Sequence, residues 1–201
     1  IGRAVALAYA REGADVCFTY LKSDEDAEET ARLVREAGVR VLPIQMDQRQ
    51  RDACDDAVLR CQRELGGIDI LVNNAGVQRT YENFLEAPEN EVREVFETNI
   101  DGLLHFCRAA LPIIPAGGCI INTTSIQALK PSANLAPYSA TKAAIANLTL
   151  SLAEEAADRG IRVNGVAPGP VWTPLIPATF PEDKVAEFGK GTLLGRPAQP
   201  A

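Results

Sequence analysis

The sequence predicts an α/β fold with a Rossmann-like, doubly wound parallel sheet. Short apolar segments alternate with helical patterns along the chain, and the segment at 68–72 has little polar alternation. Strands that alternate with helices form βαβ units, and a strand buried on both faces is apolar at nearly every position. In such a sheet, ligands bind at the carboxyl ends of the strands.

The individual elements follow from periodicity and from glycine and proline signals. We expect strands at residues 16–20, 39–46, 68–72, 119–122 and 161–166. We expect helices at residues 4–12, 24–38, 51–66, 88–111 and 136–159. Gly38, Gly66 and Gly160 stand where three of these helices should end, as is common at helix C-termini. Pro112 and Pro115 end the helix at 88–111, because proline cannot continue a helix.

The two ends of the sequence do not fit a complete fold. Ile1-Gly2-Arg3 leads directly into the first helix without a preceding strand, and the chain closes in a loop at 195–201. A doubly wound sheet needs a strand that leads into its first helix. We therefore expect a single domain over residues 1–201 that is incomplete at both ends and lacks its first and last strands.

Composition excludes several functions. The chain has 201 residues, a net charge of -7 and a pI of about 4.9, which argues against nucleic acid as a partner. No apolar run approaches the roughly 18 residues of a membrane span. Five cysteines without CxxC spacing predict reduced thiols, a cytoplasmic protein and no metal site. The single histidine, His105, lies in an apolar run, where packing or an interface is a better interpretation than catalysis.

The sharpest local signal is the segment Tyr138-Ser139-Ala140-Thr141-Lys142. Residues four apart lie on one face of a helix, so the phenol and the amine are neighbours. A nearby positive charge stabilises phenolate and lowers the tyrosine pKa, which allows proton transfer to or from a substrate oxygen. By itself the pair could equally be two solvent-facing helix residues.

Other polar residues stand at the ends of predicted strands. Ser125 closes the strand at 119–124, where its hydroxyl can stabilise charge on a reacting oxygen. Asn73-Asn74-Ala75-Gly76 follows the strand at 68–72, and its small residues would let a flat ligand approach. Asn99 lies inside a helix, where asparagine is unfavourable, so a buried polar role is worth considering. Each of these segments alone could be an ordinary turn or strand end.

Together these motifs resemble the single-domain branch of the short-chain dehydrogenases/reductases over essentially the whole chain. The resemblance implies an NAD(P)-dependent oxidoreductase that transfers a hydride between nicotinamide and a carbonyl or alcohol substrate. It implies four catalytic residues, with Tyr138 as the general acid/base: Asn99, Ser125, Tyr138 and Lys142. It implies that the cofactor is bound by Ile1, Arg3, Tyr20, Asp47, Asn73, Ala75, Gly76, Tyr138, Lys142, Pro168, Gly169, Val171 and Thr173.

The resemblance also suggests individual roles. Ile1 would end the pyrophosphate loop, Asp47 would meet the adenine, and Asn99 would hold a water linked to Lys142. The strand at 16–20 would be the second strand of a complete fold, and it ends at Thr19 and Tyr20 without an acidic residue. Since a carboxylate there would bind the 2′-hydroxyl of NAD, and since Arg3 and Lys22 could meet a 2′-phosphate, we predict NADP as preferred, with NAD possible.

The substrate should lie between the catalytic residues and the segment at 174–194, which has the composition of a mobile lid. This segment resembles a bacterial subgroup of general-stress and aldehyde-reductase-like members, which suggests aldehydes, ketones or sugar-like carbonyls. The surplus of small and apolar residues on the helix at 136–159 predicts a homo-oligomer, a dimer or tetramer.

Two other functions share parts of this pattern. A nucleotide-sugar epimerase or dehydratase of the longer branch also carries Tyr-x-x-x-Lys, but the turn at 73–76 and the segment at 168–173 argue against it. A non-catalytic cofactor-binding sensor would keep the fold, but such proteins commonly lose a catalytic side chain. NADPH oxidation with a panel of carbonyls distinguishes the three functions.

Overall fold

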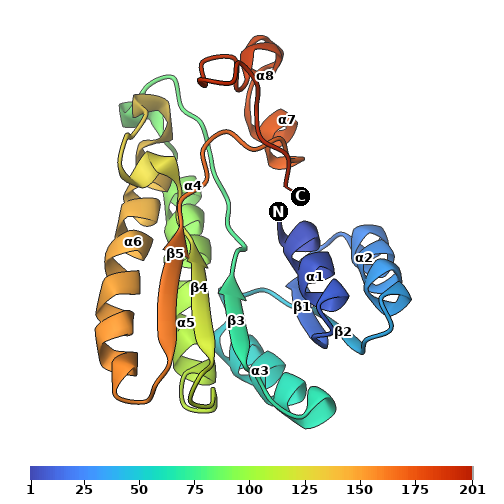
Figure 1. Cartoon of the computed structure of the whole chain (residues 1–201). Coiled ribbons are helices and arrows are strands. Elements are labelled where there is room, and N and C mark those ends of the chain that lie inside the picture. Colours follow the sequence, from blue (N-terminus) through green and yellow to red (C-terminus); the bar gives the residue numbers. More distant parts are fainter. Residues whose placement is uncertain (201) are drawn as a thin grey trace.

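The computed structural model describes residues 1–200 and confirms the α/β fold (Figure 1). Its five strands are β1 (Val16–Tyr20), β2 (Val41–Gln45), β3 (Ile70–Asn73), β4 (Cys119–Thr123) and β5 (Arg162–Val166). All strand pairs are parallel, as predicted from the alternation of strands and helices. The strands lie within a residue or two of their expected positions.

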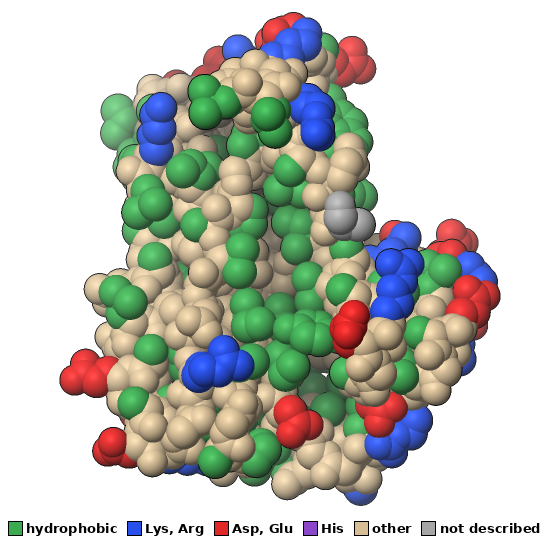
Figure 2. Space-filling model, in the orientation of Figure 1, with side chains coloured by type: hydrophobic (Ala, Val, Ile, Leu, Met, Phe, Trp, Pro, Cys, Tyr) green, Lys and Arg blue, Asp and Glu red, His purple; other side chains and the backbone are tan. Residues whose placement is uncertain are grey.

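The strands form two separate sheets. β1 pairs with β2, and β3, β4 and β5 form the second sheet in that order. Within residues 1–200, no strand pairs with the second edge of β1 or with the free edge of β3. The space-filling view shows hydrophobic side chains gathered in the hollow between the two parts (Figure 2). Ile70 on β3 is accordingly exposed.

Helices surround both sheets. The larger ones are α1 (Gly2–Arg11), α2 (Asp24–Glu36), α3 (Arg51–Leu65), α4 (Glu89–Phe96), α5 (Gly102–Ala110) and α6 (Ala136–Ala157). α1 and α2 pack together beside β1 and β2, whereas α4, α5 and α6 gather around the second sheet (Figure 1). α3 contacts both β2 and α5 and so connects the two parts.

The main core belongs to the second sheet and its helices. Its fully or nearly fully buried members include Ile114, Ile120 and Ile145, from the segment after α5, from β4 and from α6. A second cluster, around Val16 and Val34, joins α1, α2 and β1. No helix among the described residues is long and apolar enough to cross a membrane. All five cysteines are free thiols, as predicted.

The predicted helix at 88–111 differs from expectation in its middle. Residues Glu97–Asp101 form one π-helical turn, the π-turn, between α4 and α5. The N–H of Gly102 donates to the carbonyl of Glu97, five residues earlier, instead of four as in an α-helix. Single π-helical turns are frequent at functional sites, and this one contains Asn99.

Candidate active site

Four side chains meet beyond the carboxyl end of β4, and we call this group the α6 corner: Asn99, Ser125, Tyr138 and Lys142. Tyr138 and Lys142 lie on the first turns of α6, and Asn99 lies in the π-turn. β4 ends at Thr123, two residues earlier than Ser125, which instead caps a 3₁₀ turn with extended backbone. The expectation that Ser125 ends the strand is therefore corrected, although it keeps the expected place beside the strand end.

Lys142 is held between α6 and β4. Its Nζ donates to the carbonyl of Thr123 at 2.7 Å and lies 5.5 Å from the centre of the Tyr138 ring. The hydroxyl of Thr124 donates to the Lys142 carbonyl at 2.7 Å, which ties the same helix turn to the strand end. The residue is only 4% exposed, and this burial lowers the pKa of the amine to about 8.

The geometry corrects the predicted electrostatics of Tyr138. Burial raises the pKa of the phenol above its ordinary value, and a hydrogen bond with the Ser125 side chain opposes that rise. The sequence predicted a lowered pKa, on the assumption that the amine points at the phenolic oxygen. In the structure the amine donates to Thr123 instead, so desolvation decides the direction.

Asn99 is 2% exposed, and both the oxygen and the nitrogen of its side-chain amide bind the loop after β3. Its Oδ1 accepts from the Val77 N–H at 2.8 Å, and its Nδ2 donates to the Val77 carbonyl at 2.9 Å. The same Nδ2 lies 3.1 Å from the hydroxyl of Thr141 on α6. Asn99 thereby locks three segments together, which explains why this polar residue is tolerated inside a helix.

Glycine lets the loop after β3 pack closely against its neighbours. A Cβ added to Gly76 would lie 3.0 Å from Asn99 Oδ1 and 3.7 Å from Lys142 Nζ, so glycine at this position lets Asn99 and the buried amine approach the loop. A Cβ on Gly2 would lie 3.0 Å from the amide nitrogen of Asn74. The residues present fit a nicotinamide cofactor, because the buried amine of Lys142 donates to Thr123 and has further N–H donors that could bind a ribose hydroxyl.

The predicted adenosine-side residues lie on the first sheet and on β3. Tyr20 ends β1. Asp47 follows β2 and accepts hydrogen bonds from the backbone and guanidinium of Arg49. Arg49 and, more weakly, the charge of Lys22 hold the pKa of Asp47 below its usual range. Asn73 donates to Asn122 Oδ1 at 2.9 Å and also to Cys107, so its amide contacts the interior of the second sheet.

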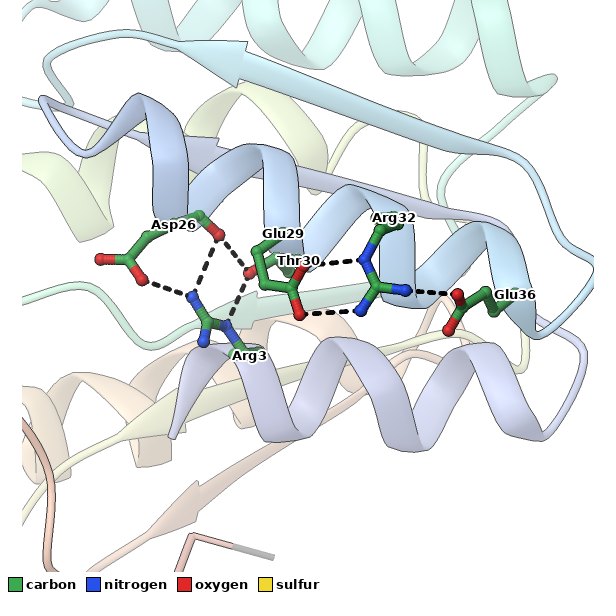
Figure 3. A network of polar contacts seen from close by, with 6 residues as sticks. All are labelled: Arg3, Asp26, Glu29, Thr30, Arg32 and Glu36. Carbon is green, nitrogen blue, oxygen red and sulfur yellow. Dashed lines mark hydrogen bonds and ion pairs between the residues drawn. The ribbon is translucent and has the colours of Figure 1, made fainter.

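Arg3 is already engaged by α2 (Figure 3). Its guanidinium donates to the Asp26 carboxylate at 2.7 Å and to the hydroxyl of Thr30 at 2.8 Å. Arg32 pairs with Glu29 and Glu36 farther along the same helix. The side chains of Arg3 and Asp26 are 42% and 72% exposed, so their ion pair is weak and easily exchanged for another anion.

The segment after β5 runs past Ser125. The carbonyl of Pro168 accepts from the N–H of Ile126, next to Ser125, at 2.9 Å. A Cβ added to Gly169 would meet no atom within 4 Å. Val171 forms a parallel bridge with Ala198, and the carbonyl of Thr173 accepts a hydrogen bond from the N–H of Ile176. Of the predicted carboxamide-side residues, these contacts place Pro168 beside the α6 corner.

The predicted lid at 174–194 contains the short helices α7 (Leu175–Thr179) and α8 (Glu182–Glu187). Tilted contacts join the ring of Phe188 to those of Trp172 and Phe180, each with centroids 6.3 Å apart. The buried Gln78 donates to the Thr179 hydroxyl at 2.6 Å, and Thr80 donates to the Thr179 carbonyl at 2.8 Å. The loop after β3 thus holds α7 in place.

Several residues that shape the site were not predicted from the sequence. Thr141 is fully buried and bonded to Asn99, and its place inside the Tyr-x-x-x-Lys segment is a signal that could have revealed it. Thr124 contacts Lys142, and Gln78 contacts the lid. Gln48 contacts the π-turn. Nothing in their local sequence shows these distant partners. Within residues 1–200, no group of three or more potential metal ligands is found.

Comparison with known proteins gives this geometry a family. Residues 1–184 match the family described as short chain dehydrogenase. The chain belongs to this family. General stress protein 39 of Bacillus subtilis is 47% identical over 200 residues, which cover all of this chain and 70% of that protein. The NADPH-dependent aldehyde reductase 1 of Arabidopsis thaliana is 43% identical over 206 residues, covering all of this chain and 72% of the reductase.

A solved structure supports the same assignment. The short chain dehydrogenase of Burkholderia cenocepacia, crystallised in complex with NADP, superposes with a TM-score of 0.91 at 32% identity. The superposition covers 99% of this chain and 80% of that one. The fold and family membership therefore confirm the predicted resemblance, and the chain is an oxidoreductase of the short chain dehydrogenase family. Its stress-protein and aldehyde-reductase relatives agree with the predicted subgroup.

Proposed function

We propose that this short chain dehydrogenase is an NAD(P)-dependent oxidoreductase that interconverts a carbonyl and an alcohol, with Tyr138 as the general acid/base. The observation that carries the proposal is the α6 corner, where the buried amine of Lys142 lies 5.5 Å from the centre of the Tyr138 ring and the Ser125 hydroxyl opposes the rise in the phenol pKa. A phenol with a raised pKa stays protonated near neutral pH. It can therefore donate a proton to a carbonyl oxygen as that oxygen becomes negative.

The other residues of the α6 corner support this proton transfer. The Ser125 hydroxyl would share the substrate oxygen with Tyr138 and stabilise the developing charge. Lys142, with a pKa of about 8, is mostly protonated at neutral pH and would place positive charge near the phenol. Asn99 would fix the loop after β3 and, by family resemblance, hold a water connected to Lys142.

The cofactor would lie across the carboxyl ends of both sheets. When bound, the nicotinamide supplies or accepts the hydride. Gly76 and Ala75 would line its site, Lys142 would grip the nicotinamide ribose, and the segment from Pro168 to Thr173 would hold the carboxamide. Asp47, Tyr20, Asn73 and Ile1 would serve the adenosine and pyrophosphate end.

We propose NADP as the preferred cofactor and NAD as a weaker alternative. No acidic residue ends β1, and the weak ion pair of Arg3 with Asp26 leaves its guanidinium available to a 2′-phosphate. The NADP complex of the Burkholderia enzyme and the Arabidopsis relative named as an NADPH-dependent reductase support this choice. The same reductase, together with the rice relative described as a glucose and ribitol dehydrogenase homolog, supports aldehydes or sugar-like carbonyls as substrates.

We further propose a homo-oligomer built through α6. Its outward face carries exposed Ala140, Ala143 and Leu150, and Leu150 is an unusually exposed large apolar residue. A second copy of the same face would cover this surface, giving a dimer or tetramer. The proposed lid at 174–194 would close over the substrate from the opposite side of the site.

The test is NADPH oxidation with a panel of aldehydes, ketones and sugars. Wild-type protein should turn over at least one substrate, and Tyr138→Phe should lose about 10²–10⁴-fold in kcat because the proton donor is gone. Tyr9→Phe, on α1 and away from the α6 corner, is the matched control and should retain wild-type rates. Tight NADPH binding without any turnover would instead support a cofactor-binding sensor.

A further inference from the structure

The side chain of Gln48 supports the π-turn from outside. Gln48 follows Asp47 in the loop after β2, about fifty residues before the helix that it touches. Its Nε2 donates to the carbonyl of Thr98 at 2.6 Å. This is the only polar contact between that loop and the π-turn among the hydrogen bonds of the described side chains.

The bond satisfies a carbonyl that the π-turn has freed. In an α-helix, the Thr98 carbonyl would accept from the N–H of Gly102. Here that N–H donates to Glu97 instead. A partly buried carbonyl that loses its helical donor is destabilising, and the amide of Gln48 donates to Thr98 in place of the Gly102 N–H.

Gly102 makes room for this contact. A Cβ at Gly102 would lie 2.7–2.9 Å from three atoms of the Gln48 side chain. The amide therefore crosses the helix at the one residue without a side chain. The backbone of Gln48 is fixed as well, since its carbonyl lies 3.2 Å from both the Cys54 sulfur and the His105 Nδ1. His105 thereby acquires a structural role, as its apolar surroundings predicted.

The peptide that Gln48 holds leads directly into Asn99. A peptide unit is planar, so fixing the Thr98 oxygen also fixes the orientation of the Asn99 N–H and the course of its backbone. Asn99 in turn binds Val77 and Thr141, on the loop and helix that carry Gly76 and Lys142. A continuous path of contacts thus joins the loop after β2 to the α6 corner.

We propose that Gln48 is a positioning residue for the proton-transfer step, acting through the π-turn on Asn99. This inference rests on the proposed function, because it assigns Gln48 to the same reaction. Asp47, its neighbour, is the residue proposed for the adenine. The loop after β2 would then serve both ends of the site: Asp47 toward the cofactor and Gln48 toward the catalytic turn.

Gln48→Met tests the proposal, because methionine keeps the length and packing of the side chain but cannot donate to Thr98. We expect kcat to fall roughly 10- to 100-fold, as misplaced catalytic groups do, with a much smaller change in the KM for NADPH. Gln62→Met, an exposed position on α3, is the matched control and should keep wild-type kcat. Unchanged kcat in Gln48→Met would overturn the proposal.

A second pair of variants guards against simple misfolding. Gly102→Ala should lower kcat in the same way by pushing the Gln48 amide aside, while alanine favours the helix. In a Gln48→Ala background the added methyl has room, so Gly102→Ala should cause little further loss. Independent, multiplicative losses in the double variant would contradict the proposed contact.

Amide hydrogen exchange separates this proposal from the proposed function. In Gln48→Met, residues 97–103 should exchange faster than in wild type, while residues 142–149 of α6 should not. If wild-type protein turns over no carbonyl, the proposed function fails, and exchange alone then decides whether Gln48 fixes the π-turn. Equal exchange in both proteins would reject that role.

Discussion

The α6 corner differs in its use of polar side chains from the charged face of α1 and α2, which consists of Arg3, Asp26, Glu29, Arg32 and Glu36. In the corner, Asn99 and Lys142 are almost fully buried, and each hydrogen bond has one specific backbone or hydroxyl partner. On the charged face, Arg3 pairs with the exposed carboxylate of Asp26, and Arg32 pairs with that of Glu29 (Figure 3). Buried hydrogen bonds are expensive to break, whereas exposed ion pairs exchange partners readily.

This difference agrees with the proposed functions of the two regions, which are proton transfer in the α6 corner and binding of a cofactor phosphate by Arg3. Proton transfer needs atoms held to within fractions of an ångström, and the corner achieves this with buried hydrogen bonds from several segments. A cofactor phosphate must instead replace existing partners when it arrives. The guanidinium of Arg3 is paired with an exposed carboxylate, and it can exchange that ion pair for a phosphate at little cost.

The largest expected effect is that of Asn99→Leu. The substitution leaves the partly buried N–H and carbonyl of Val77 without their partner in Asn99, which should lower the free energy of unfolding by about 2–6 kcal/mol at most. It should also reduce kcat strongly, because the loop that carries Gly76 loses its attachment. Chemical denaturation and steady-state kinetics measure the two effects. A loss of stability no larger than that of a surface substitution would show that the buried hydrogen bonds of Asn99 stabilise the protein no more than exposed ion pairs do.

A pH-dependent effect of intermediate size is expected from Lys142. The folded amine has a pKa of about 8, against 10.5 for the free side chain. Between these values the unfolded chain binds a proton that the folded chain has released, so this group makes stability rise with pH. The total gain is about 3 kcal/mol at most.

Comparing wild type with Lys142→Met isolates this contribution, since other groups that titrate in the same window are common to both proteins. The difference in unfolding free energy between wild type and variant should increase in favour of wild type from pH 8 to 10. Urea denaturation at several pH values measures it. Parallel curves would show that the amine is not buried as the structure has it.

The smallest effect on stability is expected on the charged face. Arg3→Gln should leave Tm within about 2 °C of wild type, because its ion pair is exposed. It should nevertheless reduce kcat/KM for NADPH about tenfold relative to NADH, through the loss of one charge-assisted contact with the 2′-phosphate. Arg32→Gln, on the same face but farther along α2, is the control and should alter neither quantity. An unchanged cofactor ratio in Arg3→Gln would exclude Arg3 from phosphate recognition.

Much of the fold could be predicted from local signals. The strand at 16–20 was predicted at its observed position, and the ends of α3 and α6 fall within two residues of expectation. Glycines explain part of this accuracy: Gly66 has the left-handed backbone, φ 95°, that its place after α3 requires. The π-turn was missed, because it depends on Val77 and Gln48, which are far from Asn99 in sequence.

What the sequence determined by itself is the order of the elements and the placement of Tyr138 and Lys142 on one face of one helix. Both follow from periodicity within a few residues. Only the tertiary structure decided that Lys142 donates to Thr123, that the Tyr138 pKa rises instead of falling, and that Gln48 reaches the π-turn. Burial and hydrogen-bond partners are set by segments that meet only after folding, so no local pattern encodes them.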